Sequence, residues 1–159
     1  MNDVEKFLDE SNKIESVYSQ EAYEDALLAW KNALEYSEIS EDMILSIHYF
    51  LMKNLNERIA GRFRNCDVWV GHKQCPNPIL IPDLLENWLM KYRDVKTEKE
   101  IMDAHIAFEG IYPFEDGNGR TGRIILNWQR AKNNLPILII HADWHDEEGE
   151  QRKYYNLFN

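Results

Sequence analysis

The segment from Pro113 to Arg123, which reads PFEDGNGRTGR, constrains the fold of this chain more than any other part of the sequence. Gly117 and Gly119 allow the backbone to take positive φ angles and to approach a ligand closely. Asn118 is a suitable N-cap for the helix that the next residues predict. The N-terminus of a helix offers free N–H groups and the positive end of its dipole, which together favour a bound anion.

Three charged side chains in the same segment strengthen this anion site. Arg120 and Arg123 are one helical turn apart, so they place two fixed positive charges on one face. Asp116 stands just before the turn, where its hard carboxylate oxygen suits an Mg²⁺ ion that bridges phosphates. The pattern therefore predicts a nucleotide site.

The dipeptides Asp116-Gly117 and Asn118-Gly119 are also common in the turns of β-hairpins, which gives an alternative interpretation. The following segment, Ile124 to Lys132, does not alternate between apolar and polar residues and is long enough for a helix of three turns. We therefore expect a loop followed by a helix.

The segment resembles the signature of the Fic proteins, His-x-Phe-x-Asp/Glu-Gly-Asn-Gly-Arg-x-x-Arg. The matching positions are Phe114, Asp116, Gly117, Asn118, Gly119, Arg120 and Arg123. Further similarity lies in Ala104–Ile111, Gly61–Arg64, Val68–Gly71 and Arg152 with Tyr155. The resemblance covers nearly the whole chain and implies an all-α, Fic-like domain with a short β-hairpin flap.

The resemblance also implies an activity, the transfer of AMP from ATP to a hydroxyl group of a target protein. The implied partners are ATP and a protein with a Ser, Thr or Tyr acceptor, and the implied cofactor is Mg²⁺. The implied site assigns the metal to Asp116 and the nucleotide to Phe114, Gly117, Asn118, Gly119, Arg120 and Arg123.

Tyr112 stands where the family has its catalytic histidine. In the implied reaction that histidine accepts the proton of the attacking hydroxyl, which imidazole can do because it titrates near neutrality. A tyrosine with an ordinary pKa of about 10 is only about 0.1% ionised at pH 7. Losing a positioned general base typically lowers the rate by about 10² to 10⁴. We therefore expect a weak or inactive transferase that still binds nucleotide.

Two origins of Tyr112 stay open. Natural divergence would give a nucleotide-binding module that regulates a protein interaction, or an enzyme of altered chemistry. Replacement of an original histidine would instead have inactivated a toxic transferase, and the otherwise intact signature favours this origin. His105 lies two helical turns earlier and is expected to pack within its helix. A third interpretation keeps the site but uses another phosphate-containing donor or the reverse cleavage.

A second motif lies in Ser11-Asn12-Lys13-Ile14-Glu15-Ser16. It resembles the family's inhibitory motif, Ser/Thr-x-x-x-Glu-Gly/Asn, although Ser16 departs from it. The resemblance implies that Glu15 pairs with Arg123 and competes for the guanidinium that should hold the γ-phosphate. We expect an inhibitory segment over about residues 8–19 of the same chain. The alternative is a solvated helix start.

Val68-Trp69-Val70 and Ile79-Leu80-Ile81 are predicted to pair as a short hairpin, which prolines 76 and 78 would confine to an edge. An edge hairpin can accept an extended target segment by strand addition, as the resemblance implies for the family's flap. The candidate docking residues are Val68, Trp69 and Val70, and the alternative is that they cover the core.

Near the C-terminus, Tyr154 and Tyr155 are candidates for stacking over the adenine, and packing of a terminal helix explains them equally well. Cys66 and Cys75 are assigned no chemistry, because two cysteines and one histidine fall short of a zinc site. The rest of the chain is predicted to be mostly helical. The expected helical features are an apolar stripe over 26–34, a helix start at Ser40, a long helix over 43–59, Pro82 as the first residue of the next helix and a helix over 97–110. Residues 135–140 are expected to form an extended segment.

A chain of 159 residues indicates one domain over 1–159, with its signature at 112–123. The net charge of −10 argues against nucleic-acid binding, but not against ATP, which meets a local cluster of arginines. No apolar run approaches the length of a membrane span and the acidic N-terminus is no signal peptide. We therefore expect no membrane contact and a cytoplasmic location, or delivery by a route without a cleaved signal. The oligomeric state stays open, a homo-oligomer included.

Overall fold

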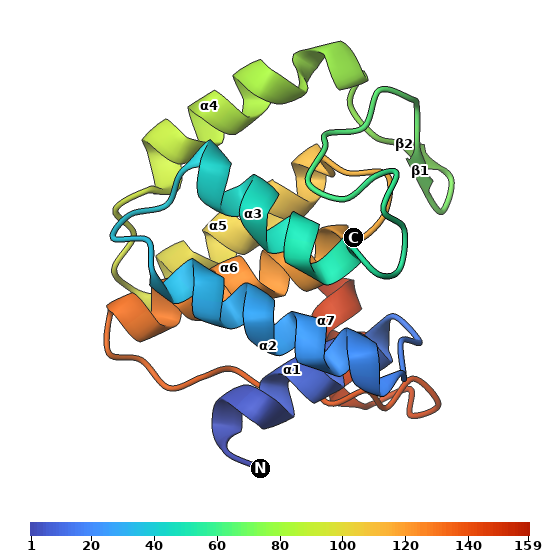
Figure 1. The fold of residues 1–159 in the computed structure, drawn as a ribbon, viewed down its shortest axis with the longest axis vertical. Coiled ribbons are helices and arrows are strands. Elements are labelled where there is room, and N and C mark those ends of the chain that lie inside the picture. Colours follow the sequence, from blue (N-terminus) through green and yellow to red (C-terminus); the bar gives the residue numbers. More distant parts are fainter.

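The computed structural model describes residues 1–159, and nearly all of its regular secondary structure consists of helices (Figure 1). In chain order these are α1 (Asp3–Ile14), α2 (Gln20–Leu34), α3 (Glu41–Met52), the 3₁₀ turn η1 (Pro78–Leu80), α4 (Ile81–Tyr92), α5 (Glu98–Ile111), α6 (Asn118–Lys132) and α7 (Glu150–Asn156). The strands β1 (Trp69–Val70) and β2 (Lys73–Gln74) form an antiparallel hairpin in which Trp69 lies opposite Gln74. The predicted all-α fold with a small hairpin is confirmed.

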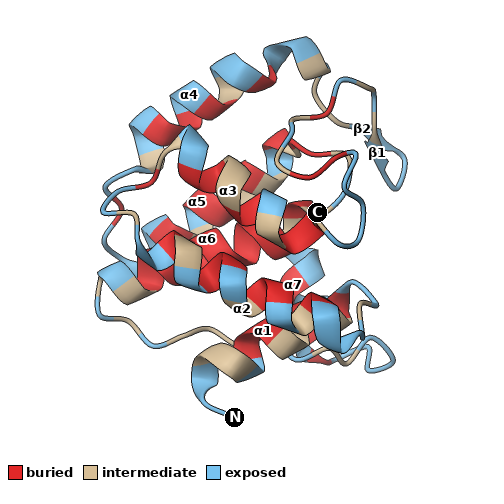
Figure 2. Ribbon diagram, viewed as in Figure 1, coloured by how far each residue is buried: buried red, intermediate tan, exposed pale blue.

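Helix α6 lies in the middle of the molecule, in contact with α5, α3, α2 and α1. Most of its residues are buried, as the red central ribbon in Figure 2 shows. A helix enclosed on all sides has no polar face for solvent, so its apolar residues from Ile124 to Leu126 anchor the core while its first turn faces other helices. The loop and helix predicted from the signature are therefore present, and the alternative of a turn between strands is wrong.

Side chains fix the starts of several helices. Ser19, Ser40 and Thr97 cap α2, α3 and α5, each accepting a hydrogen bond from the backbone N–H three residues later. Asn2 and Glu5 form a capping box at the start of α1. The helix start predicted at Ser40 is confirmed, and the helix predicted over 97–110 is α5 with Thr97 as its cap.

The long helix predicted over 43–59 is wrong, because α3 ends at Met52 and turns follow. The two residues after Met52 do not continue the helix, and their side chains bind a buried carboxylate of α2. Lys53 Nζ lies 2.9 Å from Asp25 Oδ1, and Asn54 donates to Asp25 Oδ2 at 2.8 Å. A tertiary contact thus overrides the apolar periodicity, helped by the low helix propensity of asparagine.

The predicted pairing of the hairpin is also wrong. Its second strand is Lys73–Gln74, while residues 79 and 80 lie in η1, which Asn77 caps. Gly71 takes a positive φ of 60°, which allows a two-residue turn directly after Val70. Because the strand partner follows so soon, the segment with the two prolines is free to form the 3₁₀ turn. Pro82 lies at the second position of α4, since that helix already begins at Ile81.

The C-terminal segment returns to the core and then covers α1. Residues 135–140 form no strand, but Leu135, Ile137 and Leu138 pack against the core as an irregular segment. Asp143 then caps α7 by accepting from the N–H groups of residues 150 and 151. No helix of the structure combines the length and the apolar character that crossing a bilayer would need.

Candidate active site

The loop between α5 and α6 is held in shape by its own asparagine. Asn118 Oδ1 accepts from the Phe114 N–H at 2.9 Å, and Asn118 Nδ2 donates to the Phe114 carbonyl at 2.8 Å. The N-cap is therefore Gly117, whose φ of 84° suits glycine, and the prediction of Asn118 as the cap is wrong. No side chain caps α6, so its first N–H groups are available to an anion.

His48 of α3 packs against the same loop, although the sequence analysis did not single it out. Its ring stacks on Phe114 with centroids 3.7 Å apart. Its Nδ1 accepts from the Gly61 N–H at 3.0 Å, so Nε2 carries the hydrogen and donates to the Asp116 carbonyl at 2.8 Å. Burial lowers the His48 pKa to about 4, which keeps the ring neutral. A lone histidine on an otherwise apolar helix face was the available signal.

Arg120 and Arg123 both lie buried at the start of α6, 3% and 2% exposed. Arg123 Nε donates to Ser11 Oγ at 2.8 Å, and Arg123 Nη2 donates to Glu15 Oε1 at 2.9 Å. The Glu15–Arg123 pair expected from the motif is thus present, with the Glu15 side chain still 36% exposed. Burial, followed by repulsion from Arg123, lowers the Arg120 pKa to about 10.

The Glu15 carboxylate lies over the first turn of α6. A Cβ added at Gly119 would come within 2.6 Å of Glu15 Oε1 and 2.8 Å of Arg123 Nη1. Glycine at 119 therefore leaves space for a negatively charged oxygen beside both the helix N-terminus and a guanidinium. The geometry is that of an anion site in which a carboxylate of the same chain already lies.

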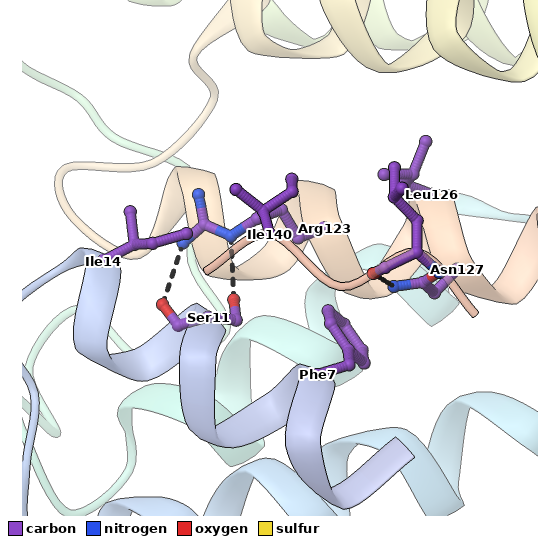
Figure 3. A pocket seen from close by; sticks show the side chains of 8 residues that line it. Phe7, Ser11, Ile14, Arg123, Leu126, Asn127 and Ile140 are labelled. Carbon is purple, nitrogen blue, oxygen red and sulfur yellow. Dashed lines mark hydrogen bonds between the residues drawn. The ribbon is translucent and has the colours of Figure 1, made fainter. Parts of the chain in front are cut away.

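Helix α1 packs directly onto Arg123. Figure 3 shows the Arg123 guanidinium facing Ser11, with Ile14 beside it and Phe7 one turn further away. The crevice between α1, α6 and the segment ending at Ile140 has no room for a water molecule. The solvated helix start considered for this motif is wrong, because Ser11 and Ile14 are buried in the last turns of α1.

Comparison with known proteins identifies the family to which the chain belongs. The Fic/DOC family matches residues 38–129, more than half of the chain. The chain belongs to the Fic/DOC family. It is 30% identical over 140 residues to a probable protein adenylyltransferase of Aquifex aeolicus, covering 85% of this chain and 44% of that protein. It is also 30% identical over 156 residues to the protein adenylyltransferase Fic of Aedes aegypti, covering 95% of this chain and 29% of that protein. The chain thus spans less than half the length of these relatives.

Solved structures share the fold. A Fic domain containing signaling protein from Bacteroides thetaiotaomicron superposes with a TM-score of 0.79 at 16% identity, covering 97% of this chain and 69% of that one. Fic-1 from C. elegans superposes with a TM-score of 0.77 at 20% identity, covering 97% of this chain and 54% of that one. At these identities the likeness concerns the Fic fold alone.

Tyr112, which the resemblance aligns with the Fic histidine, is the C-cap of α5. It takes a left-handed conformation with φ 52°, which is unusual for a bulky residue. Burial raises the Tyr112 pKa above its ordinary value, and the carboxyl of Glu109 raises it further. The phenolate is therefore rarer than in free tyrosine, which makes Tyr112 a still weaker base.

Two further titratable groups lie buried beside the Fic signature. His105 contacts the Tyr154 hydroxyl through Nε2 at 2.8 Å, and burial lowers its pKa to about 3, so it packs as a neutral ring as expected. Glu109 was missed by the sequence analysis. The residue is half-buried, its Oε1 is buried without a hydrogen-bond partner, and burial raises its pKa to about 8. Its place one helical turn before Tyr112 was the only signal.

The flap of this Fic domain is anchored to the signature by Arg64. The buried guanidinium donates to the carbonyls of Tyr112, Cys66 and Pro76 at 2.7, 3.0 and 2.7 Å. Trp69 and Val70 at the tip are 56% and 53% exposed, so they do not cover the core. Val68 is half-buried and its carbonyl accepts from the Cys75 N–H. Docking of a target on these residues stays a prediction.

The remaining predicted site residues lie around the two arginines. Asp116 is exposed at the edge of the loop, where its Oδ1 accepts from the Gly117 N–H at 2.8 Å. A single exposed carboxylate fits Mg²⁺, which is commonly held by one or two carboxylates together with phosphates. Tyr154 is buried and Tyr155 is 41% exposed, so of the two only Tyr155 presents a large surface to a ligand. Their stacking on adenine stays a prediction.

Proposed function

We propose that this Fic domain binds Mg²⁺-ATP at the N-terminus of α6 and transfers AMP to a hydroxyl group of a target protein. The observation that carries the proposal is the Glu15 carboxylate, which lies against Gly119 and binds Arg123. The site already accommodates anionic oxygen, and its free N–H groups and arginines suit phosphate better than a single carboxylate. Several relatives of similar sequence are named protein adenylyltransferases.

Each part of the site has a task in this proposal. The uncapped turn at residues 117–119 binds phosphate oxygens through backbone N–H groups, and Asp116 offers a carboxylate to Mg²⁺. Bound Mg²⁺ would offset phosphate charge. Arg120 and Arg123 hold the outer phosphates, while Glu15 restrains Arg123 and leaves the triphosphate misplaced for in-line attack. The flap tip presents the target segment, and Arg64 keeps it close to position 112.

Proton transfer is the weak step. An attacking hydroxyl must lose its proton as its oxygen bonds to the α-phosphorus and the bond to the departing pyrophosphate breaks. Its raised pKa prevents Tyr112 from accepting that proton at neutral pH. We therefore propose that Tyr112 leaves nucleotide binding unchanged and makes the chemical step about 10² to 10⁴ slower than with histidine. Self-inhibition by Glu15 and impairment by Tyr112 act independently, because one blocks phosphate placement and the other blocks the base.

A second candidate function follows from Tyr112 itself. The anion site is intact while the catalytic base is replaced, a combination suited to a nucleotide-binding module without catalysis. In that role ATP would displace Glu15 and alter the surface that α1 offers to a protein partner. A toxin-like role and a cytoplasmic location stay predictions.

The decisive experiment restores the base and removes the restraint. The double variant Tyr112→His with Glu15→Gly is incubated with Mg²⁺ and ATP labelled at the α-phosphate, alone and with a cell lysate. We expect label on protein, in amounts well above those given by Glu15→Gly alone. Tyr112→Phe with Glu15→Gly is the matched control and should stay inactive. If the double variant binds ATP but labels nothing, the transferase proposal loses its support and the binding module is preferred.

A further inference from the structure

Helix α1 binds the signature arginines through contacts that do not involve Glu15. Arg120 Nε donates to Asn12 Oδ1 at 2.8 Å, with both residues buried. Arg123 Nη2 also donates to the backbone carbonyl of Ser11 at 3.1 Å. The last turn of α1 therefore holds both arginines that the proposed function assigns to phosphate.

Arg120 is a buried cation that the carboxylates of Glu15, Asp116 and Asp25 attract without pairing with it. Its Nε donates to the neutral amide of Asn12, its Nη2 is buried without any partner, and it forms no ion pair. A buried charge needs an opposite charge or a full set of hydrogen bonds to be stable. Arg120 therefore has a free donor, Nη2, that an anion could accept from, while Asn12 Oδ1 occupies its Nε.

The Ser11 carbonyl adds a restraint that belongs to the backbone. It is one of the last carbonyls of α1, which lack partners within the helix and carry the negative end of its dipole. Arg123 binds this carbonyl as well as the Glu15 carboxylate. Replacing the Glu15 side chain would remove only one of these contacts.

We propose that Asn12 is a second inhibitory residue, which restrains Arg120 as Glu15 restrains Arg123. Nucleotide phosphates reach both arginines only when the whole last turn of α1 moves away. This inference rests on the proposed nucleotide site and goes beyond the Ser-x-x-x-Glu motif, in which the residue after serine is unspecified. It predicts that removing Glu15 alone releases the site only in part.

The test measures binding of Mg²⁺-ATP to the full chain by calorimetry. We expect Glu15→Ala to bind more tightly than the unaltered chain, and Asn12→Ala in that background to bind about tenfold more tightly still. Asn12→Asp should have the opposite effect, because it keeps the acceptor oxygen and adds a charge that pairs with Arg120. Lys13→Ala is the matched control, since Lys13 on the same helix contacts only Asp9 and Glu10.

The outcomes separate this inference from the function on which it rests. If Glu15→Ala binds ATP and adding Asn12→Ala changes nothing, Asn12 is no restraint while the nucleotide site stands. If Lys13→Ala strengthens binding as much as Asn12→Ala, general loosening of α1 explains the effect and the inference is overturned. If none of the variants binds ATP, both proposals fail. Should Asn12→Ala not fold, the sign of the Asn12→Asp effect decides.

Discussion

The side chain of Arg64 and the backbone of Tyr112 are joined by a hydrogen bond of 2.7 Å from Nε to the carbonyl oxygen. The same guanidinium also binds the carbonyls at both ends of the flap, those of Cys66 and Pro76. One buried side chain thus sets the position of the flap relative to Tyr112. Its planar, fork-shaped donor set allows this, and lysine lacks that geometry.

Arg64→Lys should therefore destabilise the fold by about 2 to 4 kcal/mol, because it leaves buried carbonyls without donors and an ammonium without its full set of partners. Denaturant unfolding measures this loss. Arg62→Lys is the control, because Arg62 is an exposed neighbour. A loss below 0.5 kcal/mol for Arg64→Lys would show that the flap does not depend on this side chain.

Gly122→Ala should destabilise the chain by about 1 kcal/mol at most, because its Cβ would collide with Glu109 Oε1, whose flexible side chain must move. Replacing Glu109 by alanine should remove most of this penalty, which a double-mutant cycle would detect as coupling. Gly110→Ala is the matched control, since nothing lies near its added Cβ. It should stabilise α5 by roughly 0.5 to 1 kcal/mol. Equal effects of Gly122→Ala with and without Glu109 would contradict the predicted contact.

The buried carboxyl of Glu109 should make stability fall as the pH rises. Its pKa is about 8 in the folded chain and near 4.5 when unfolded, so between these values the folded state holds a proton that the unfolded state has lost. The slope contributed by Glu109 is at most about 1.4 kcal/mol per pH unit. Glu109→Gln, which cannot titrate, should gain stability relative to the unaltered chain from pH 5 to pH 8. Parallel pH profiles of the two proteins would exclude this role.

His48 should give the opposite pH dependence. Its folded pKa of about 4 lies below its ordinary 6.5, so the unfolded state binds the extra proton and stability rises between those values. His48→Phe preserves stacking on Phe114 but loses the bonds to Gly61 and Asp116. We expect it to destabilise the chain by about 1 to 3 kcal/mol at pH 7 and by less at pH 4.5. An equal loss at both pH values would argue against a neutral, bonded ring.

Local pattern was sufficient for much of the site. The two glycines and two arginines of the signature predicted a loop and a helix start with positive charge, since backbone freedom and i, i+3 spacing act within a few residues. The Ser-x-x-x-Glu spacing, read through the family, predicted the pair between Glu15 and Arg123, 108 residues apart. The conformation of Ser16 also fits that motif, because its φ of 57° is one that glycine and asparagine adopt most easily.

Where the sequence analysis failed, side-chain contacts that short-range patterns do not reveal determined the outcome. Asp25 ended α3 early by binding Lys53 and Asn54, and Asn118 left the cap to Gly117 by bonding Phe114.

The sequence by itself therefore determined the family, the helical class and the loop and helix start of the signature, because these depend on residue types at short fixed spacings. Only the tertiary structure decided that Asn12 binds Arg120, that His48 supports the loop and that Glu109 Oε1 is buried without a partner. Those roles arise when helices distant in the chain pack together, and burial then changes what each polar group can bind.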